Sequence, residues 1–559
     1  MASSAREEIS RTAASLSLVA LLAFVAVGHL AWLAADSSLS GYDELAFFDH
    51  LIKYRAFLQQ EHMTHWLGFL DFSSYPALPF LAGLVAWRGG EGSVTVIRLT
   101  GVIFHLLWIL SIYGIGHRLA NRLTGLVAAG VIALSPLATI LARHYASFLL
   151  HAALATFAVY ILLRIKDASG AKGAAAAGLA CSLALLSERG TPLLYLAGPI
   201  LWIIVLRLRG ANRRVRQRLV IDFVLFALIV VVIAGPYLLG YFRANLAHTM
   251  TLSKQAVIGG RGAQYYLDHL RGALVGPAFF PLLIFGIASG VARRDRRFML
   301  PLLWLAIPLI VLSGLATKDM VYALSMTAPL ALACGLGAAH LPRRFWRAPI
   351  LLVLLLFAAV GWVRVGDPDL PFSRKTEHLH FLSLHDASVL PIDHPRRDLD
   401  AGRLLAAVRE LHAKSDDIWA ITGVSVKPDG SWARKDYGDS IRVLMLLHGV
   451  PGRYLLALND LFPGRAAANS DDQCLVLAPA SAARPGSVAA FLARPAFAPD
   501  EHLAVEPRLI QEWRNLELYP ARVMGLASRR LLLYRATVPA TTPAEGAGQS
   551  PPIAGAVSP

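Results

Sequence analysis

Long apolar runs separated by short basic segments dominate the first two thirds of the chain. A helix needs about twenty predominantly apolar residues to cross the hydrocarbon of a bilayer, and eleven stretches come close to that length. The first of them follows charged residues, as in a signal peptide, but it is long and lacks a cleavage site, so we expect it to remain as a span. The predicted spans are 14–35, 96–116, 124–141, 145–163, 174–187, 191–206, 219–239, 273–292, 298–315, 321–340 and 348–363.

The pattern changes after residue 365. A connector containing His and Pro, residues 366–398, leads to residues 399–536, where "AGRLLAAVRELHAK" has helical spacing and "DIWAIT", "QCLVLA" and "RRLLLYRA" are typical of strands. We therefore expect a transmembrane domain over 1–365, a small α/β domain over 399–536, and a disordered tail over 537–559 that is rich in Pro, Ala, Gly and Thr.

Composition supports a membrane protein and accounts for the charge. Of 559 residues, 56% are hydrophobic and only 16% are charged, and the mean hydropathy is +0.52, whereas soluble domains carry about 25% charged residues. The net charge of +16 does not indicate nucleic-acid binding, because the arginines cluster between apolar runs, as in cytoplasmic loops. This bias places the N-terminus in the cytoplasm and everything after residue 366 on the opposite face.

Two adjacent carboxylates, Asp43 and Glu44, follow the first predicted span by about eight residues. They open the first outer loop, in which Leu45, Phe48, Leu51, Ile52 and Leu58 form an apolar stripe at helical spacing. Such a stripe predicts a helix that lies along the membrane interface. Acids that merely decorate a loop are the alternative interpretation of the pair.

Basic residues also occur on the outer face, where few are expected. Arg143, Arg189 and Lys318 each stand beside a polar neighbour in a short outer loop, and Arg261 belongs to a longer outer segment, 240–272. Each lone cation could simply snorkel at a helix end. Their coincidence with the carboxylates instead predicts a site where cations bind a lipid phosphate and a carboxylate acts as general base.

Histidines give a weaker signal. We expect His105 and His151, inside spans, to be packed or hydrogen-bonded in the core, and the histidines of the connector fit no standard zinc spacing. The three cysteines indicate no disulfide framework.

An acidic pair after the first span, a long first outer loop and the run from Val96 to Ile165 resemble the bacterial family 39 glycosyltransferases of the GT-C type. These include relatives of protein O-mannosyltransferases and of the lipid A aminoarabinose transferase. The matching pieces are Asp43-Glu44, Arg98-Leu99, Gly116-His117-Arg118, Gly125, Ser135-Pro136, Ala142-Arg143-His144-Tyr145, Arg189-Gly190 and Lys318 with Tyr322 and Pro329.

The resemblance implies transfer of a sugar from a polyprenyl-phosphate carrier to an acceptor, with inversion, on the outer face of the membrane. Asp43 would activate or orient the acceptor and Glu44 would complete the pair. Some relatives bind a divalent metal near the site, whose ligands here stay unknown. The carrier phosphate or substrate would be bound or neighboured by Arg143, His144, Tyr145, Arg189, Lys318 and Tyr322, with Lys53, Arg55, Tyr75 and Arg261 as further candidates.

Two departures from the family pattern concern specificity. The first loop has Tyr75-Pro76-Ala77-Leu78 where many relatives have a Lys-Pro-Pro-Leu-like or His-Pro-Pro-Leu-like motif, so Lys53 or Arg55 would have to supply the basic contact. Ser147 stands where many relatives carry an Asp. Donor or acceptor is therefore expected to differ from the well-known branches.

The sequence thus predicts a polytopic all-α GT-C bundle of about eleven transmembrane helices, with interfacial helices in the first periplasmic loop and a periplasmic C-terminal α/β domain. The expected location is the bacterial inner membrane, multi-pass, and the expected partners are a polyprenyl-phosphate-linked sugar, the lipid bilayer and an envelope acceptor (lipid, glycan or protein), without nucleic acid. A polyprenyl-lipid transporter or flippase, or a non-catalytic envelope assembly protein, are the alternatives.

Overall fold

The computed structural model describes residues 10–35, 76–90, 93–164, 170–188, 191–209, 212–255, 263–314, 320–341 and 344–366, eight positions between 44 and 55, and five strands between 419 and 537. The chain divides into two compact units, residues 1–38 with 46–397 and residues 39–45 with 398–559. The limits expected for the transmembrane domain, linker, α/β domain and tail stay predictions.

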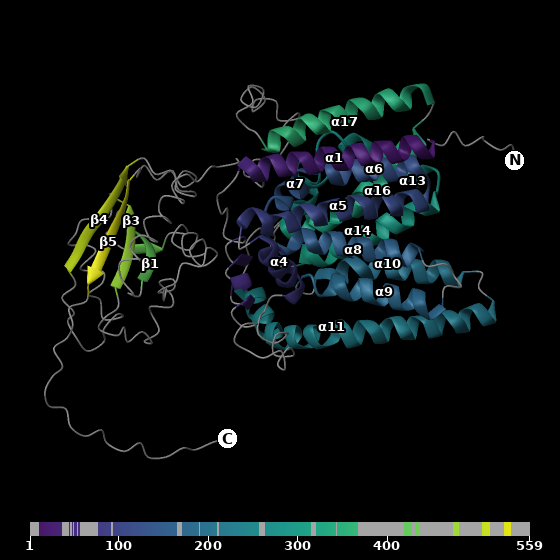
Figure 1. The fold of residues 1–559 in the computed structure, drawn as a ribbon. Helices are drawn as coiled ribbons and strands as arrows, with labels where there is room; N and C mark the ends of the chain where they lie inside the picture. The colour runs from purple at the N-terminus through teal and green to yellow at the C-terminus, as the bar shows by residue number, and fades with distance from the viewer. Residues whose placement is uncertain are drawn as a thin grey trace, which may run out of the picture. The chain divides into compact units, whose positions relative to one another are not determined.

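Helices make up the described part of the first unit, and most of them run roughly parallel or antiparallel to one another (Figure 1). Within this unit α17 and α1 lie along one side and α11 along the opposite side. The longer helices are α1 (Arg11–Ala35), α4 (Ala77–Gly90), α5 (Val94–Leu119), α6 (Arg122–Ala133), α8 (Ser147–Arg164), α9 (Gly170–Leu185), α10 (Thr191–Leu208), α11 (Arg213–Gln255), α13 (Phe280–Ala292), α14 (Met299–Gly314), α16 (Thr327–His340) and α17 (Arg344–Gly366). The shorter ones are α7 (Pro136–Ala142), α12 (Ala263–His269), α15 (Met320–Ala323), the π-helical turn η2 (Leu270–Leu274), and the 3₁₀ turns η3 (Arg296–Phe298) and η4 (Leu324–Met326).

Seven helices in the described residues are long and apolar enough to cross a membrane, or eight if the bent pair α6 and α7 is one span. Three shorter apolar helices are Gly170–Leu185, Phe280–Ala292 and Arg347–Val363. Every predicted span falls on one of these segments, so a multi-pass helical membrane protein is confirmed. The number eleven stays a prediction, because it also counts these three shorter apolar segments as spans.

The span predicted at 124–141 is two helices, α6 and α7, bent by 61°. The break lies at Ser135-Pro136, where the Ser135 hydroxyl accepts a hydrogen bond from the Ala138 amide at 3.4 Å. Pro136 takes the first helical position, where its missing N–H costs nothing but its ring prevents α6 from continuing. The sequence therefore holds a stop and a new start in the middle of one apolar run.

Helix α11 is longer than the predicted span 219–239. It continues to Gln255 over 43 residues, a length of about 64 Å at 1.5 Å per residue. The segment 240–255, expected to belong to an outer loop, is therefore helical. Gly240 does not end the helix, because no proline follows it within the next few residues.

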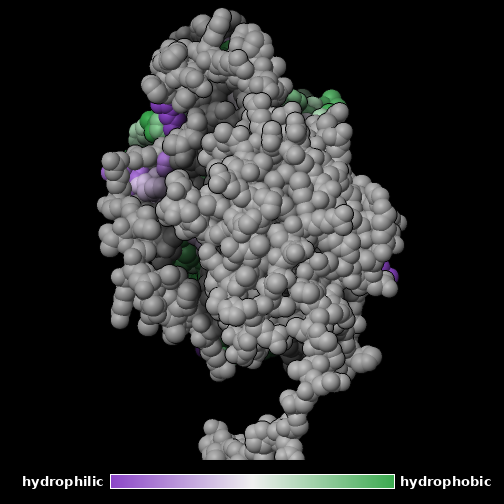
Figure 2. Space-filling model, turned by 90° about the vertical axis from the view of Figure 1, so that its left-hand side faces the viewer, coloured by the Kyte–Doolittle hydropathy of each residue, from purple (hydrophilic) through white to green (hydrophobic). Residues whose placement is uncertain are grey.

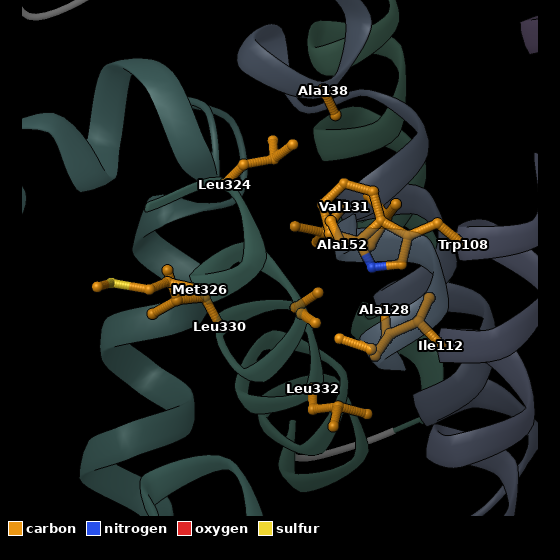
Figure 3. Packing of buried hydrophobic residues seen from close by; sticks show 14 of the residues in the cluster. Trp108, Ile112, Ala128, Val131, Ala138, Ala152, Leu324, Met326, Leu330 and Leu332 are labelled. Carbon is orange, nitrogen blue, oxygen red and sulfur yellow. The ribbon is translucent and has the colours of Figure 1, made fainter. Parts of the chain in front are cut away.

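Helix α16 lies in the core of the bundle, and 89% of its spanning window is buried. Its sequence "TAPLALACGLGAAH" is rich in Ala and Gly, which allow helices to approach closely in a membrane. Figure 3 shows Leu332 of α16 pointing toward the side where Trp108 and Ile112 of α5 lie, whereas Leu330 points to the opposite side, with Met326. Ala128 and Val131 of α6 and Ala152 of α8 fill the same layer.

Glycines mark the points where backbones touch. A Cβ added to Gly286 of α13 would lie 2.4 Å from the Ala333 carbonyl oxygen of α16, and one added to Gly337 would lie 2.7 Å from Gly286 Cα. The same holds between α5 and α6, where Gly116 and Gly125 meet. These glycines are required by the close approach.

Within residues 398–559 of the second unit, the described residues form a five-stranded sheet of order β2-β1-β3-β5-β4. Its strands are β1 (Trp419–Val426), β2 (Trp432–Arg434), β3 (Gln473–Pro479), β4 (Glu506–Arg514) and β5 (Arg530–Thr537). β1 and β3 are parallel, whereas the other pairs are antiparallel. The helices predicted beside these strands lie outside the described residues, so the α/β class of this domain stays a prediction.

We predict that Gly286→Ala destabilises the fold, because the new methyl group meets backbone atoms of α16 that cannot rotate away. Overpacking of this kind costs about 1–3 kcal/mol, which thermal unfolding of the purified protein in detergent will report as a lower melting temperature. Gly89→Ala in α4 is the matched control, since its Cβ would have nothing within 4 Å, and equal melting temperatures for the two variants would contradict the predicted helix contact.

We also predict that Thr156→Val weakens the contact between α5 and α8. The buried Trp108 indole Nε1–H donates to Thr156 Oγ1 at 2.8 Å, and the isosteric valine removes this acceptor. Interhelical hydrogen bonds in membranes contribute about 0.6–1.7 kcal/mol. Thr100→Val serves as control because the Thr100 hydroxyl bonds only within α5, to the Ile97 carbonyl; a loss as large in this control would refute the interhelical assignment.

Candidate active site at one end of the bundle

The up-and-down order of the helices brings many of the predicted site residues to one end. We call this the outer end: α1, α7 and α9 end there, and α5, α8 and α10 begin there. Figure 2 shows the protein from the left-hand side of Figure 1; few described residues are visible in this view, some of them polar, in purple, and some apolar, in green. Residues that are distant in the sequence, such as Arg98, Arg143 and Glu188, thereby share one end of the fold.

Arg143 is one of two buried arginines described at this end, with 1% of its surface exposed; Arg98 of α5 is the other. It follows α7 directly, so the break at Ser135-Pro136 sets its position. Its guanidinium carbon lies 5.1 Å from the ring centroid of Trp32 in α1 and 5.4 Å from that of Trp362 in α17. Cation–π contacts of this kind stabilise a desolvated guanidinium by about 2 kcal/mol, so the first and last described helices of the first unit hold the charge between them.

Two histidines, His29 and His105, lie beside Arg143 and its two tryptophans. The ring of His29 in α1 meets Trp362 edge-on at 5.5 Å, and His29 Nε2 lies 3.1 Å from His105 Nδ1 in α5. His105 Nε2 lies 3.1 Å from the Ile132 carbonyl oxygen, which can only accept, so Nε2 of His105 carries the proton and its Nδ1 accepts from His29. The prediction of a packed, hydrogen-bonded His105 is confirmed.

Tyr145 and His144 lie in the turn between α7 and α8. The Tyr145 hydroxyl donates to the Pro79 carbonyl oxygen of α4 at 2.8 Å, and its burial raises the pKa of this phenol well above its usual range, so it stays a donor. His144 Nδ1 lies 2.9 Å from the Ile140 carbonyl oxygen. Tyr145 therefore fixes α4 against the turn that carries Arg143.

The sequence analysis missed a buried carboxylate partnership. The Ser147 hydroxyl donates a short hydrogen bond to Glu188 Oε2, and both residues are buried. Ser147 begins α8, whereas Glu188 follows α9. The signal was present in the sequence, because Ser147 replaces the acid of many relatives and a Glu precedes Arg189, but only the fold shows that the two meet.

Tyr322 also lies at the outer end. Its carbonyl oxygen accepts a hydrogen bond from the Tyr195 hydroxyl of α10, and its ring lies 6.1 Å from Phe148 of α8. His151, one turn after Ser147 on α8, packs with its ring centroid 5.4 Å from that of Tyr195. His151 is thus a packed core histidine, as predicted, although neither ring nitrogen has a hydrogen-bond partner in the part of the chain that the structure describes.

The segment after the acidic pair is helical at all eight described positions between 44 and 55. Phe48 and Leu51 of the predicted apolar stripe are fully buried, as is Tyr54 to within 2%. The rings of Phe47 and Phe48 lie 6.2 and 5.2 Å from Tyr145. A helix here is confirmed, and its apolar face is packed on protein; its place along the membrane interface stays a prediction.

Charged groups at the outer end are buried to an unusual degree. Glu44 is 3% exposed, Arg98 is fully buried, and Glu188 is 4% exposed. Because buried charges are costly unless compensated, such residues commonly mark functional sites in membrane proteins. Arg55 is half-buried instead, with its guanidinium 4.5 Å from the Trp87 ring of α4.

Half of the predicted site lies outside the described residues. This half comprises Asp43, Lys53, Tyr75, Arg189, Arg261 and Lys318. Their roles stay predictions.

No metal centre can be built from the residues that the structure describes, since no group of three or more His, Cys, Asp or Glu side chains among them could hold an ion. The expectation of a divalent metal near the site stays a prediction. What the described residues offer is a buried guanidinium, a protonated phenol and buried carboxylates, a set suited to binding an oxyanion and moving a proton.

No family model matches this sequence, and no curated protein matches it either. Solved structures do match: ArnT from Cupriavidus metallidurans in the apo state is 14% identical, with a TM-score of 0.54 over 92% of this chain and 98% of that one. ArnT from the same organism bound to undecaprenyl phosphate is 13% identical, with a TM-score of 0.56 over 92% and 97% of the two chains.

A third match is the oligosaccharyltransferase of Archaeoglobus fulgidus in complex with Zn and sulfate, 14% identical, with a TM-score of 0.44 over 82% of this chain and 68% of that one. At these identities the ArnT matches establish the fold. The chain has the fold of ArnT, a GT-C protein of family 39, and the resemblance predicted from the sequence is confirmed at that level.

Proposed function

We propose that this protein is a multi-pass membrane glycosyltransferase. It transfers a sugar from a polyprenyl-phosphate carrier to an envelope acceptor (a lipid, a glycan or a protein) on the periplasmic face of the bacterial inner membrane. The transfer inverts the configuration at the anomeric carbon. The N-terminus then lies in the cytoplasm and the C-terminal domain in the periplasm.

The observation that carries this proposal is the buried guanidinium of Arg143 at the outer end of an ArnT-like fold. ArnT was crystallised with undecaprenyl phosphate, a lipid whose headgroup is an anion. A guanidinium recognises phosphate by charge-assisted, bidentate hydrogen bonds. Arg143 is therefore the residue of the described set best suited to bind the carrier phosphate, with Arg189 and Lys318 as the predicted additional cations.

Asp43 is the proposed general base, and the chain limits how far it can lie from this site. It precedes Phe47 by four residues, so the two Cα atoms are at most about 14 Å apart. Phe47 in turn contacts the ring of Tyr145, two residues after Arg143. This covalent tether supports a shared site for Asp43 and Arg143, with Glu44 as the neighbouring carboxylate.

The proposed reaction is a single displacement. An acceptor hydroxyl oxygen forms a bond to the anomeric carbon while its proton passes to Asp43. The bond from that carbon to the phosphate oxygen breaks, and its electron pair stays on the phosphate. Arg143 stabilises the charge that develops on this oxygen, which is a role that a preorganised cation in a water-poor site performs well.

We predict that Asp43→Asn lowers turnover at least about 100-fold, because a positioned general base contributes that much or more. The assay incubates purified protein with a total bacterial envelope extract, which supplies both lipid-linked sugars and acceptors, and measures released polyprenyl phosphate by mass spectrometry. Glu91→Gln, another acid of the outer loops by sequence, is the control. Full turnover in folded Asp43→Asn protein would reject the role of Asp43, and no turnover in wild type with any donor would favour a transporter or an assembly protein.

We also predict that Arg143→Gln lowers kcat/KM for the carrier about 10- to 150-fold, the loss expected for a hydrogen bond to a charged group of about 1.5–3 kcal/mol. Arg143→Lys should retain part of the activity because it keeps the charge. The control is Arg118→Gln, at the opposite end, whose guanidinium also stands over an aromatic ring, that of Tyr160 at 5.9 Å. If the two glutamine variants lose activity equally, Arg143 does not bind the carrier.

A further inference from the structure

A cavity of about 240 Å³ lies between α8, α9, α10 and α11. It is at the inner end of the bundle, where α8 and α10 end and α9 and α11 begin. Its walls are apolar except for Arg207 and Asp222. The cavity is thus a hydrocarbon-lined space with a polar mouth.

The sequence explains why the helices leave this space. Ile200, Ile203, Ile204 and Arg207 form one stripe of α10 at helical spacing. Leu219, Asp222, Phe223 and Phe226 form the facing stripe of α11. Between these bulky stripes α9 presents only Ala174 and Ala177, whose small side chains do not fill the gap.

Arginines are concentrated in the segment that joins α10 to α11. Six occur from Arg207 through Arg218, both included, and Arg207 lines the cavity. Arg207 is anchored, because a terminal guanidinium nitrogen donates to the Leu162 carbonyl oxygen of α8 at 2.9 Å. Arg218 lies against the first residue of α9: a Cβ added to Gly170 would be 3.0 Å from its guanidinium. Gly170 has φ +59, which favours glycine, and so leaves room for that guanidinium.

The geometry points to a structural site for an anionic glycerophospholipid at this end of the bundle, with the headgroup phosphate among the arginines and one acyl chain in the cavity. The positive arginines near the cavity complement the negative phosphate of the headgroup, which favours this occupant. Basic pockets between transmembrane helices on the cytoplasmic side suit anionic headgroups, and the charge bias of the loops places this end on that side. Asp222 limits the positive charge inside the cavity, so the headgroup belongs at the mouth, near Arg207 and Arg218.

The carrier lipid is expected to bind elsewhere. Its proposed phosphate site is at Arg143, just before the start of α8, whereas the cavity lies at the other end of α8. The inner site does not depend on the proposed glycosyltransferase activity. It requires only an ordinary membrane phospholipid and the helices α8 to α11.

The test uses the full-length protein in detergent, incubated with equal amounts of dioleoylphosphatidylglycerol and dioleoylphosphatidylcholine, with bound lipid counted by native mass spectrometry. We expect the wild type to retain phosphatidylglycerol at least fivefold in excess. Each arginine near an anionic headgroup contributes about fivefold in affinity, so Arg207→Gln with Arg218→Gln should lower retention about 25-fold. Arg207→Lys with Arg218→Lys should keep most of it.

The matched control is Arg293→Gln with Arg296→Gln, two exposed arginines of the loop between α13 and α14 at the same end of the bundle. This pair should change phosphatidylglycerol retention less than twofold. Ala177→Leu fills the cavity and should lower retention while leaving every arginine in place. All variants are compared after gel filtration as monodisperse protein.

Five results would overturn the assignment. Four are equal retention of the two lipids by the wild type, an equal loss in the control pair, unchanged retention in Ala177→Leu, and a loss in the lysine variants as large as in the glutamine variants, which would indicate disrupted packing instead of lost charge. The fifth comes from adding undecaprenyl phosphate to the same mixture: if it displaces phosphatidylglycerol, the inner site is a carrier site.

Discussion

The absence of water inside the bilayer is the constraint on which this structure depends. Every backbone polar group there has to be satisfied within the protein, so the first unit is built from helices, and its core is made by bringing their backbones together. The cost of placing charge in hydrocarbon then decides where ionisable side chains can lie. In the described residues, charged side chains such as Arg143 and Arg207 lie toward the two ends of the bundle.

The two ends differ in kind. At the outer end Arg143 and Glu188 are buried, and aromatic rings or a hydroxyl hold them in fixed positions, Arg143 between two tryptophans and Glu188 beside Ser147. At the inner end most arginines are exposed along the start of α11. Buried, fixed charge suits chemistry on a specific substrate, whereas exposed charge suits orientation in the membrane and contact with abundant lipids.

Much of the fold could be predicted from the sequence because a span has a length and a composition that a single sequence displays. The break within α6 and α7 was less accessible, since an apolar run of the right length concealed Ser135-Pro136, although the motif itself is a standard helix start. The extension of α11 beyond Gly240 was missed because a glycine and the following polar residues also suit a loop. Neither error affects which end each span reaches.

The candidate site was harder to predict than the fold. The sequence shows that Arg143, Tyr145 and Tyr322 lie at span ends, but partners such as Pro79, Trp362 and Tyr195 come from segments between about 65 and 220 residues away, and no local pattern pairs them. Glu188 was passed over for the same reason. Its hydrogen-bond partner, Ser147, is 41 residues away in the sequence, so the residues next to Glu188 do not predict the contact.

The contacts of Trp32 and Trp362 with Arg143 have a consequence for how the protein is made. Trp32 belongs to α1 and Trp362 to α17, the last described helix of the first unit, so both faces of this guanidinium are covered only after α17 has been inserted. Until then one side of a positive charge faces lipid or the translocation machinery. Insertion of the described membrane helices therefore ends with the step that completes the outer end, and a chain cut short before α17 emerges with that arginine half enclosed.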